Sequence, residues 1–211
     1  MTFCTDIDLL HWEPNLLREA SFASQTLLSG TGQLSGTSFT LDSGSFLTSH
    51  VEPGQVIVLS GPISGCFPIV SVESETELML SVLYDQLGIG SDSPQPSPIA
   101  TASNVSFVVR TFWPQRRVIS ELLTQSAGVD DPAKILNPHA LRRACVLGTL
   151  QLIYSALAAA AQEPAAFIVR ADLYERLYRR ALRKATLDID TNADGETDTR
   201  RNLNVLELRR V

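Results

Sequence analysis

The residues most suited to chemistry form a short cluster near the end of the sequence. Side-chain oxygens occupy positions 1, 3, 5 and 9 of a calcium loop of the EF-hand type, namely Asp190, Asn192, Asp194 and Asp198. Gly195 stands at position 6, where such a loop turns sharply, but position 12 is Arg201 rather than a bidentate glutamate. The spacing therefore predicts either a calcium site completed by Asp188 or by another chain, or an Asp/Asn/Gly turn whose side chains cap their own backbone.

Catalytic constellations are not evident elsewhere in the sequence. The histidines, His11, His50 and His139, are isolated from any nucleophile or metal-ligand pair. No glycine-rich segment continues into a lysine-bearing helix, as a phosphate-binding loop would. We therefore expect a protein that is not an enzyme, requires no cofactor and at most binds calcium.

The three cysteines, Cys4, Cys66 and Cys145, are far apart in the sequence. Their odd number and wide spacing fit neither a disulfide framework nor a zinc site, so the sequence predicts free thiols in a reducing cytoplasm. No apolar run reaches the length of a membrane span, about 18 residues. We expect no membrane partner.

Charged residues are divided unevenly along the chain of 211 residues, whose formal net charge is −6. Residues 1–109 contain one basic and eleven acidic residues, whereas residues 110–211 contain sixteen basic and twelve acidic ones. Arginine outnumbers lysine fifteen to two, and arginine makes bidentate contacts with carboxylates at interfaces. Two hypotheses stay open: copies of the chain dock head to tail through opposite charges, or both surfaces are only solvated.

Helical patterns lie on both sides of a segment of different texture. Proline positions and apolar spacing predict helices over residues 14–25, 114–127, 138–161 and 164–187, with Asn137 as the N-cap of the third. The inward stripe of the second helix is expected to be Val118, Ile119, Leu122 and Leu123. That of the last helix is expected to be Phe167, Leu173, Leu177 and Ala181.

The segment between these helices, residues 27–111, is rich in Gly, Ser and Thr. Its short apolar runs, separated by turn signals, predict about five strands, at residues 38–41, 55–59, 67–72, 77–82 and 105–111. Strands of this length and spacing are typical of a small β-barrel or sandwich. Residues 87–103 carry three prolines and are expected to form a loop.

Together these patterns predict an α+β fold: a helical bundle with an inserted small β-barrel or sandwich module and an extended C-terminal arm. The helical domain comprises residues 1–26 plus 112–187, the β module 27–111 and the arm 188–211. The arm is too polar and too short to fold alone, so we expect it to dock on this chain or on a neighbour. The residues expected to make that contact are Arg200, Arg201, Arg209 and Arg210.

Four short motifs are spread over nearly the whole chain. They are Asp6-Ile7-Asp8-Leu9-Leu10, Thr111-Phe112-Trp113-Pro114-Gln115, Leu141-Arg142-Arg143-Ala144 before the long Ala/Leu helix, and Arg200-Arg201-Asn202-Leu203. In these motifs the chain resembles the head–tail connector (adaptor) proteins of tailed bacteriophages. It departs from the simpler members in carrying the β module.

The resemblance implies a structural virion protein that forms a ring, commonly of twelve copies, between portal and tail. Such a protein is assembled in the host cytoplasm and stays at the head–tail interface of the virion. Its implied partners are the portal protein, other neck or tail proteins and its own copies, and genomic DNA passes through the ring without sequence-specific binding. Two alternatives stay open: a stopper or tail-completion protein, and a calcium-dependent module that binds a glycan or a protein.

Overall fold

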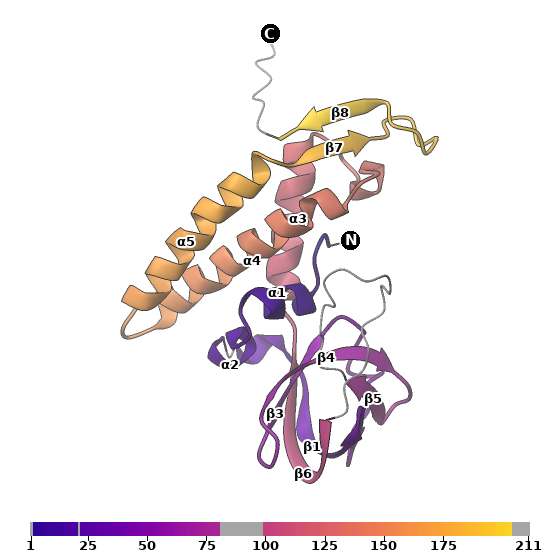
Figure 1. Ribbon diagram of the computed structural model, residues 1–211, viewed down its shortest axis with the longest axis vertical. Helices are drawn as coiled ribbons and strands as arrows, with labels where there is room; N and C mark the ends of the chain where they lie inside the picture. The colour runs from indigo at the N-terminus through magenta and orange to yellow at the C-terminus, as the bar shows by residue number, and fades with distance from the viewer. Residues whose placement is uncertain (1, 21, 81–98, 204–211) are drawn as a thin grey trace. The chain divides into compact units, whose positions relative to one another are not determined.

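The computed structural model describes residues 2–20, 22–80 and 99–203 (Figure 1). The chain divides into two compact units. The barrel unit is Thr5–Phe112, and the helical unit joins Met1–Cys4 to Trp113–Val211. The backbone therefore passes from one unit to the other twice, after Cys4 and after Phe112.

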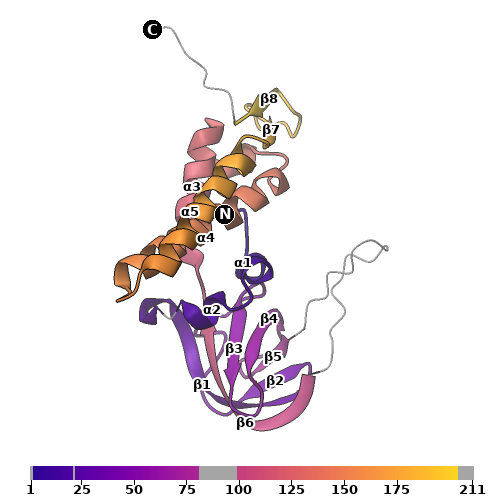
Figure 2. The same ribbon diagram turned by 60° about the vertical axis from the view of Figure 1, so that its left-hand side comes forward.

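The barrel unit is built on a closed antiparallel barrel (Figure 2). Around it the strands follow the order β1-β2-β5-β4-β3-β6, and β6 pairs with β1 to close the ring. Each described strand of the barrel therefore pairs with a strand on either side, which limits the usual template for pairing with another chain. The strands are β1 (Thr26–Gly36), β2 (Ser38–Leu41), β3 (Val56–Ser60), β4 (Gly65–Val72), β5 (Glu77–Leu80) and β6 (Ile99–Arg110).

Aromatic rings fill the inside of the barrel. Phe39, Phe46 and Phe107 are almost completely buried, and the Phe39 and Phe107 rings meet edge to face with centroids 5.1 Å apart. The ring of Phe107 lies against Gly30, and that of Phe39 lies against Gly32. Glycine at these two positions of β1 therefore makes room for the rings of the neighbouring strands.

Two short helices belong to the barrel unit, α1 (Asp6–Trp12) and α2 (Leu16–Glu19). A reciprocal capping box begins α1, because the side chains of Thr5 and Asp8 each accept from the other's backbone N–H. The buried carboxylate of Asp6 accepts hydrogen bonds from the Thr111 hydroxyl at 2.8 Å and from the Phe112 N–H at 3.0 Å. These bonds fasten α1 to the segment that follows β6.

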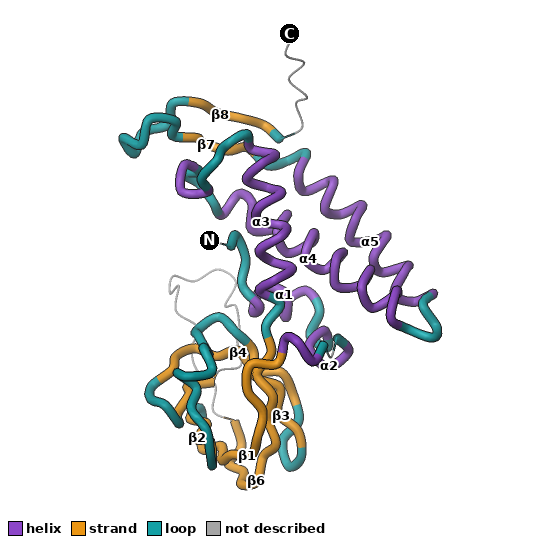
Figure 3. Tube along the Cα trace, turned by 180° about the vertical axis from the view of Figure 1, so that it is seen from behind, coloured by secondary structure: helices purple, strands orange, loops and turns teal. Residues whose placement is uncertain are grey.

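The helical unit is centred on its longest helix, α4 (His139–Ala160). Helices α3 (Trp113–Ala127) and α5 (Ala165–Leu182) both contact it, and α4 and α5 run side by side as a long hairpin (Figure 3). Gly148 of α4 shows how closely its neighbours approach. A Cβ atom there would lie 3.1 Å from Ile119 of α3 and 3.1 Å from Tyr178 of α5.

A two-stranded hairpin follows α5. Strand β7 (Thr186–Ile189) pairs antiparallel with β8 (Thr199–Asn202), and an isolated bridge joins Ile189 to Ile135, just after the 3₁₀ turn η2 (Pro132–Lys134). The side chains of Leu187, Ile189 and Ile135 are buried. The hairpin is therefore seated on the helical unit of its own chain.

The chain is α+β, but the expected fold, a helical bundle carrying a small β module, is wrong. The barrel unit covers about half of the chain and includes α1 and α2. It spans Thr5–Phe112, whereas the predicted β module spans residues 27–111. The helix expected over residues 14–25 is reduced to Leu16–Glu19 and the 3₁₀ turn η1 (Ala23–Gln25). The sequence pattern missed β1, because its many small polar residues lack the apolar alternation of a half-buried strand.

The extended C-terminal arm is also corrected. Residues 188–203 form the end of β7, an exposed loop and β8, which pairs with β7 and contacts the same chain through Arg201 and Leu203. The predicted loop at 87–103 lies mostly outside the described residues, and its last part, residues 99–103, belongs to β6. The five predicted strands each overlap an observed strand. The predicted end of the helix over residues 114–127 is confirmed, since α3 ends at Ala127 and Gly128 follows with a positive φ of 71°.

Candidate interaction surfaces

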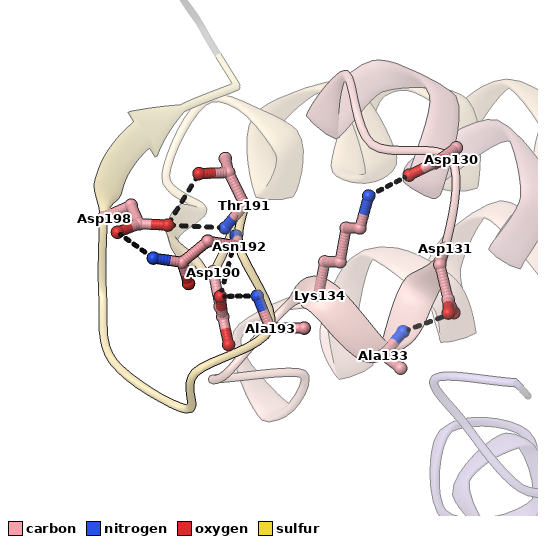
Figure 4. A network of polar contacts seen from close by, with 9 residues as sticks. All are labelled: Asp130, Asp131, Ala133, Lys134, Asp190, Thr191, Asn192, Ala193 and Asp198. Carbon is pink, nitrogen blue, oxygen red and sulfur yellow. Dashed lines mark hydrogen bonds and ion pairs between the residues drawn. The ribbon is translucent and has the colours of Figure 1, made fainter.

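The Asp-rich loop between β7 and β8 is held by its own side chains (Figure 4). Asp190 is 5% exposed, and its Oδ1 accepts from the backbone N–H groups of Asn192 at 3.1 Å and Ala193 at 2.6 Å. Its Oδ2 accepts from the Gly195 N–H at 2.8 Å. One carboxylate thus satisfies three backbone donors of the loop, as in an Asx turn.

The other polar side chains of the loop act in the same way. Asp198 Oδ2 accepts from the Thr191 N–H at 2.8 Å and from its hydroxyl at 2.6 Å. Asn192 Oδ1 accepts from the Asp194 N–H, and Asp194 Oδ1 accepts from the Glu196 N–H. Hydrogen bonds from the side chain and backbone of Thr191 hold the pKa of Asp198 below its ordinary value of 3.8.

The four residues of the predicted calcium loop are therefore brought together, with their oxygens turned toward backbone donors. Within residues 2–20, 22–80 and 99–203, no group of three or more His, Cys, Asp or Glu side chains is placed to hold a metal ion. The capped-turn alternative accounts for the backbone N–H groups that donate to Asp190 and Asp198, and Asp198 also accepts from the side chains of Thr191 and Asn192. Calcium binding remains a prediction.

Asn137 anchors the C-terminal hairpin. Its Nδ2 donates to the Thr186 carbonyl at 3.1 Å and to Asp188 Oδ2 at 3.2 Å, and its Oδ1 accepts from the Asp188 N–H at 2.9 Å. The backbone N–H of Leu136 adds a bond to the Asp188 carbonyl at 2.9 Å. The predicted N-cap role of Asn137 is wrong, since α4 begins after Pro138 without a side-chain cap and the amide of Asn137 serves β7 instead.

Two of the arginines expected to contact a partner contact their own chain. Arg200 Nε lies 2.8 Å from Asp188 Oδ1, with 72% of the Arg200 side chain exposed. Arg201 Nη1 donates to the Ala127 carbonyl at 2.9 Å, at the end of α3, where backbone carbonyls lack helical partners. Arg209 and Arg210 lie outside the described residues.

An exposed apolar face lies on α3. Of its predicted inward stripe, Ile119 and Leu123 are buried, whereas Val118 is 47% exposed and Leu122 is 45% exposed. The two exposed residues are one helical turn apart and so share a face. We call Val118 and Leu122 the α3 face.

A second exposed apolar face lies on the first half of α5. Ile168, Val169 and Leu173 are 47%, 66% and 44% exposed, and their spacing places them on adjoining turns of one side of the helix. Leu173 was expected to face inward, and that expectation is wrong. We call these three residues the α5 face.

Basic side chains follow the α5 face along the rest of this helix and directly after its end at Leu182. They are exposed at Arg176, Arg179, Arg180, Arg183 and Lys184. The described part of the barrel unit, in contrast, carries nine acidic and two basic residues. The two units therefore differ in the charge that they carry, as the charge division along the sequence indicated.

Three contacts were not predicted from the sequence. They are the anchor at Asn137, the buried carboxylate of Asp6 and the meeting of Cys4 with Cys145 in the core of the helical unit. The spacing Thr5-x-x-Asp8 was a readable signal of a helix start next to Asp6. All three contacts join residues far apart in the sequence, and no local pattern contains the partners.

Helix α4 also meets the length and apolar composition needed to cross a membrane, alone among the described residues. Half of that window is buried inside the protein, as in the central helix of a bundle. Comparisons with protein-family models, curated proteins and solved structures give no match for this chain. The assignment of a function therefore depends on the surfaces described above and on the resemblance of the four motifs.

Proposed function

We propose that this chain is a structural subunit that assembles head to tail into a ring and serves as a head–tail connector in a tailed-phage particle. In this role the ring lies between portal and tail and surrounds the channel through which DNA leaves. The observation that carries the proposal is the pair of exposed apolar faces on α3 and α5. The phage setting is supported by the four motifs alone.

The two faces suit contacts between copies because they belong to different helices. Both α3 and α5 pack on α4, and at Gly148 their side chains approach it together. A subunit with two different exposed apolar surfaces can form heterologous contacts, in which the α3 face of one copy meets the α5 face of the next. Such contacts close into a ring when a whole number of identical rotations between neighbouring copies completes one full turn.

Apolar side chains at helical spacing normally indicate burial. Leu173 and Val118 follow that spacing yet remain exposed in the single chain. A second copy that covers them would remove this apolar surface from water, and each fully buried Val or Leu side chain contributes about 1.5–3 kcal/mol.

Charge adds direction to this association. The basic second half of α5 and the acidic barrel unit attract each other between copies and repel like surfaces, which favours head-to-tail over head-to-head encounters. The net charge of −6 repels passing DNA as a whole, and in this proposal the clustered cations of α5 meet the acidic barrel unit of the next copy.

Single substitutions on each face test the assembly. Val169→Glu on the α5 face and Val118→Glu on the α3 face should each abolish annular particles in electron micrographs and leave monomers in sedimentation. The matched control is Leu47→Glu, because Leu47 is 53% exposed but lies in the barrel unit. This variant should assemble like the unaltered chain.

Mixing the two face variants sharpens the test. Each variant keeps the face that the other has lost, so an equal mixture should form complexes of two chains that grow no further. Two monomer populations that never combine would overturn the heterologous contact. Binding of the unaltered rings to a portal ring would support the connector role. A solitary monomer whose melting temperature rises with calcium would favour the calcium-dependent binding module instead.

A further inference from the structure

Two cysteines of the helical unit meet in its core. Cys4 and Cys145 are 141 positions apart in the sequence, yet their Sγ atoms lie 2.6 Å from each other. Cys4 is 3% exposed and Cys145 is 0% exposed. Both are free thiols, as the sequence predicted, but their closeness was not predicted.

The segment that carries Cys4 is held in place by other contacts. The Phe3 N–H donates to Ser120 Oγ at 3.2 Å, and the side chain of Phe3 is buried. Arg116 Nη1 donates to the Cys4 carbonyl at 2.8 Å. Because these bonds fix the backbone on α3, the thiol of Cys4 is presented to Cys145 of α4 without further rearrangement.

We propose that Cys4 and Cys145 form an intramolecular disulfide when the chain meets a small-molecule disulfide such as oxidised glutathione. The sulfur atoms need to approach by only about half an ångström to reach the bonded distance of about 2.04 Å. The third cysteine, Cys66 of β4, belongs to the barrel unit and stays reduced within the chain.

The reaction is two successive thiol–disulfide exchanges. During a local opening of residues 2–4, the thiolate of one cysteine attacks a sulfur of oxidised glutathione, which forms a mixed disulfide and releases one glutathione. The second cysteine, as thiolate, then attacks the protein sulfur of that mixed disulfide and releases the other glutathione. The protein loses two electrons and two protons, and the oxidised glutathione is reduced to two thiols.

The surroundings of the thiols favour oxidation of Cys4 and Cys145 over oxidation of Cys66. The Cys4 thiol beside Cys145 lowers the pKa of Cys145, against the opposing effect of burial. Burial raises the pKa of Cys66, so less of it is thiolate near neutral pH.

The cross-link would fasten one connection between the two units. The chain enters the barrel unit at Thr5, directly after Cys4, so the bond would fix the start of that connection on α4. In a particle released from a reducing cytoplasm this bond would form after assembly. That timing rests on the proposed function, whereas the bond itself does not.

Thiol titration of the purified chain tests the proposal. In a Cys66→Ser background only the pair remains. Incubation with oxidised glutathione followed by denaturation should reduce the titratable thiols from two to none, with a faster band on a non-reducing gel and a mass lower by two hydrogens. The matched controls add Cys4→Ser or Cys145→Ser to this background, and neither should give the faster band.

Stability gives a second readout. The disulfide closes a long loop, so the melting temperature of the oxidised Cys66→Ser chain should rise by at least about 5 °C over the reduced chain. Retention of both thiols under the same oxidising buffer, or dimers linked between chains as the only product, would overturn the proposal. Because this assay uses the monomeric chain, its failure would leave the proposed ring assembly unaffected.

Discussion

The barrel unit and the helical unit satisfy their apolar side chains in different ways. In the barrel, thirteen buried residues form one cluster inside a sheet that closes on itself. In the helical unit, α4 is covered by α3 and α5, whose outer sides carry apolar residues that nothing in the described chain covers. Of the nine large apolar side chains exposed in the described residues, seven belong to the helical unit.

In our proposal this difference decides where copies of the chain bind one another. A closed barrel offers neither strand edges nor a broad apolar surface, so it can be stable alone and present charge to water. Helices α3 and α5 each bury the side that packs on α4, and exposed apolar residues on their other sides are typical of surfaces that bind another molecule. The helical unit is thus the assembling part of our proposal, and the barrel is a self-contained acidic module.

The largest effect should come from a single methyl group in the barrel. In Gly32→Ala the new Cβ would lie 2.5 Å from the Thr40 carbonyl oxygen and 2.6 Å from the Phe39 ring, so the backbone of β2 must move. We expect a loss of more than about 3 kcal/mol in the free energy of unfolding, measured with urea.

Gly30→Ala is the matched control on the same strand. There the added methyl meets only the edge of Phe107 at 3.3 Å, which needs a small shift of one ring. Equal stability of the two variants would show that the barrel yields more easily than its closed geometry indicates.

Two leucines of the helical unit provide the next comparison. Both were expected in inward stripes, but Leu123 of α3 is completely buried and Leu173 of α5 is 44% exposed. Leu123→Ala should lower the free energy of unfolding by about 2–5 kcal/mol, and Leu173→Ala by less than about 1 kcal/mol. Both are measured by denaturant unfolding at concentrations where the chain is monomeric. A large loss from Leu173→Ala in the monomer would mean that the α5 face is covered within the chain.

The loop between β7 and β8 should respond moderately. Asp190→Ala leaves the N–H groups of Asn192, Ala193 and Gly195 without their acceptor, and we expect a loss of about 1–3 kcal/mol. Glu196→Ala, which removes another carboxylate of the same exposed loop, should change stability by less than about 0.5 kcal/mol.

Calcium distinguishes the two interpretations of this loop. If the side chains only cap backbone N–H groups of the loop, millimolar calcium should not change the melting temperature of the unaltered chain. A rise that disappears in Asp190→Ala would show that the loop holds the ion.

The smallest effect concerns pH. Since the folded chain holds the pKa of Asp198 below 3.8, the ionised carboxylate stabilises the loop above that pH, and this contribution is lost as the pH falls through the lower, folded value. In Asp198→Asn the melting temperature should depend slightly less on pH between about 5 and 2 than in the unaltered chain. Thermal melts across that range measure the difference, and identical profiles would count against the bonds from Thr191.

Local patterns were enough to predict much of the barrel. Runs of β-branched and aromatic residues between turn signals located β2 to β6, because strands and turns depend on neighbouring residues. The same reasoning missed β1, whose glycines make sense only beside the rings of Phe39 and Phe107. It also missed how the barrel closes, since the β1–β6 ladder joins residues far apart in the sequence.

The candidate surfaces were predictable only in part. The Asp-rich loop was found from its spacing, but the partner of Asn137 lies about fifty positions away in β7. Leu173 was expected in the inward stripe of its helix, but it is 44% exposed. Helical spacing shows that a residue prefers burial and says nothing of which molecule buries it.

By itself, the sequence determined the charge division, the free thiols, the position of the Asp-rich loop and most of the local elements, because each depends on residue type or on contacts between near neighbours. Only the tertiary structure decided that the barrel closes through β1, that residues 188–203 fold back on their own chain, that Cys4 meets Cys145, and which apolar faces of α3 and α5 stay open. These features join distant parts of the chain, and the free energy that selects them comes from packing, to which no local pattern gives access.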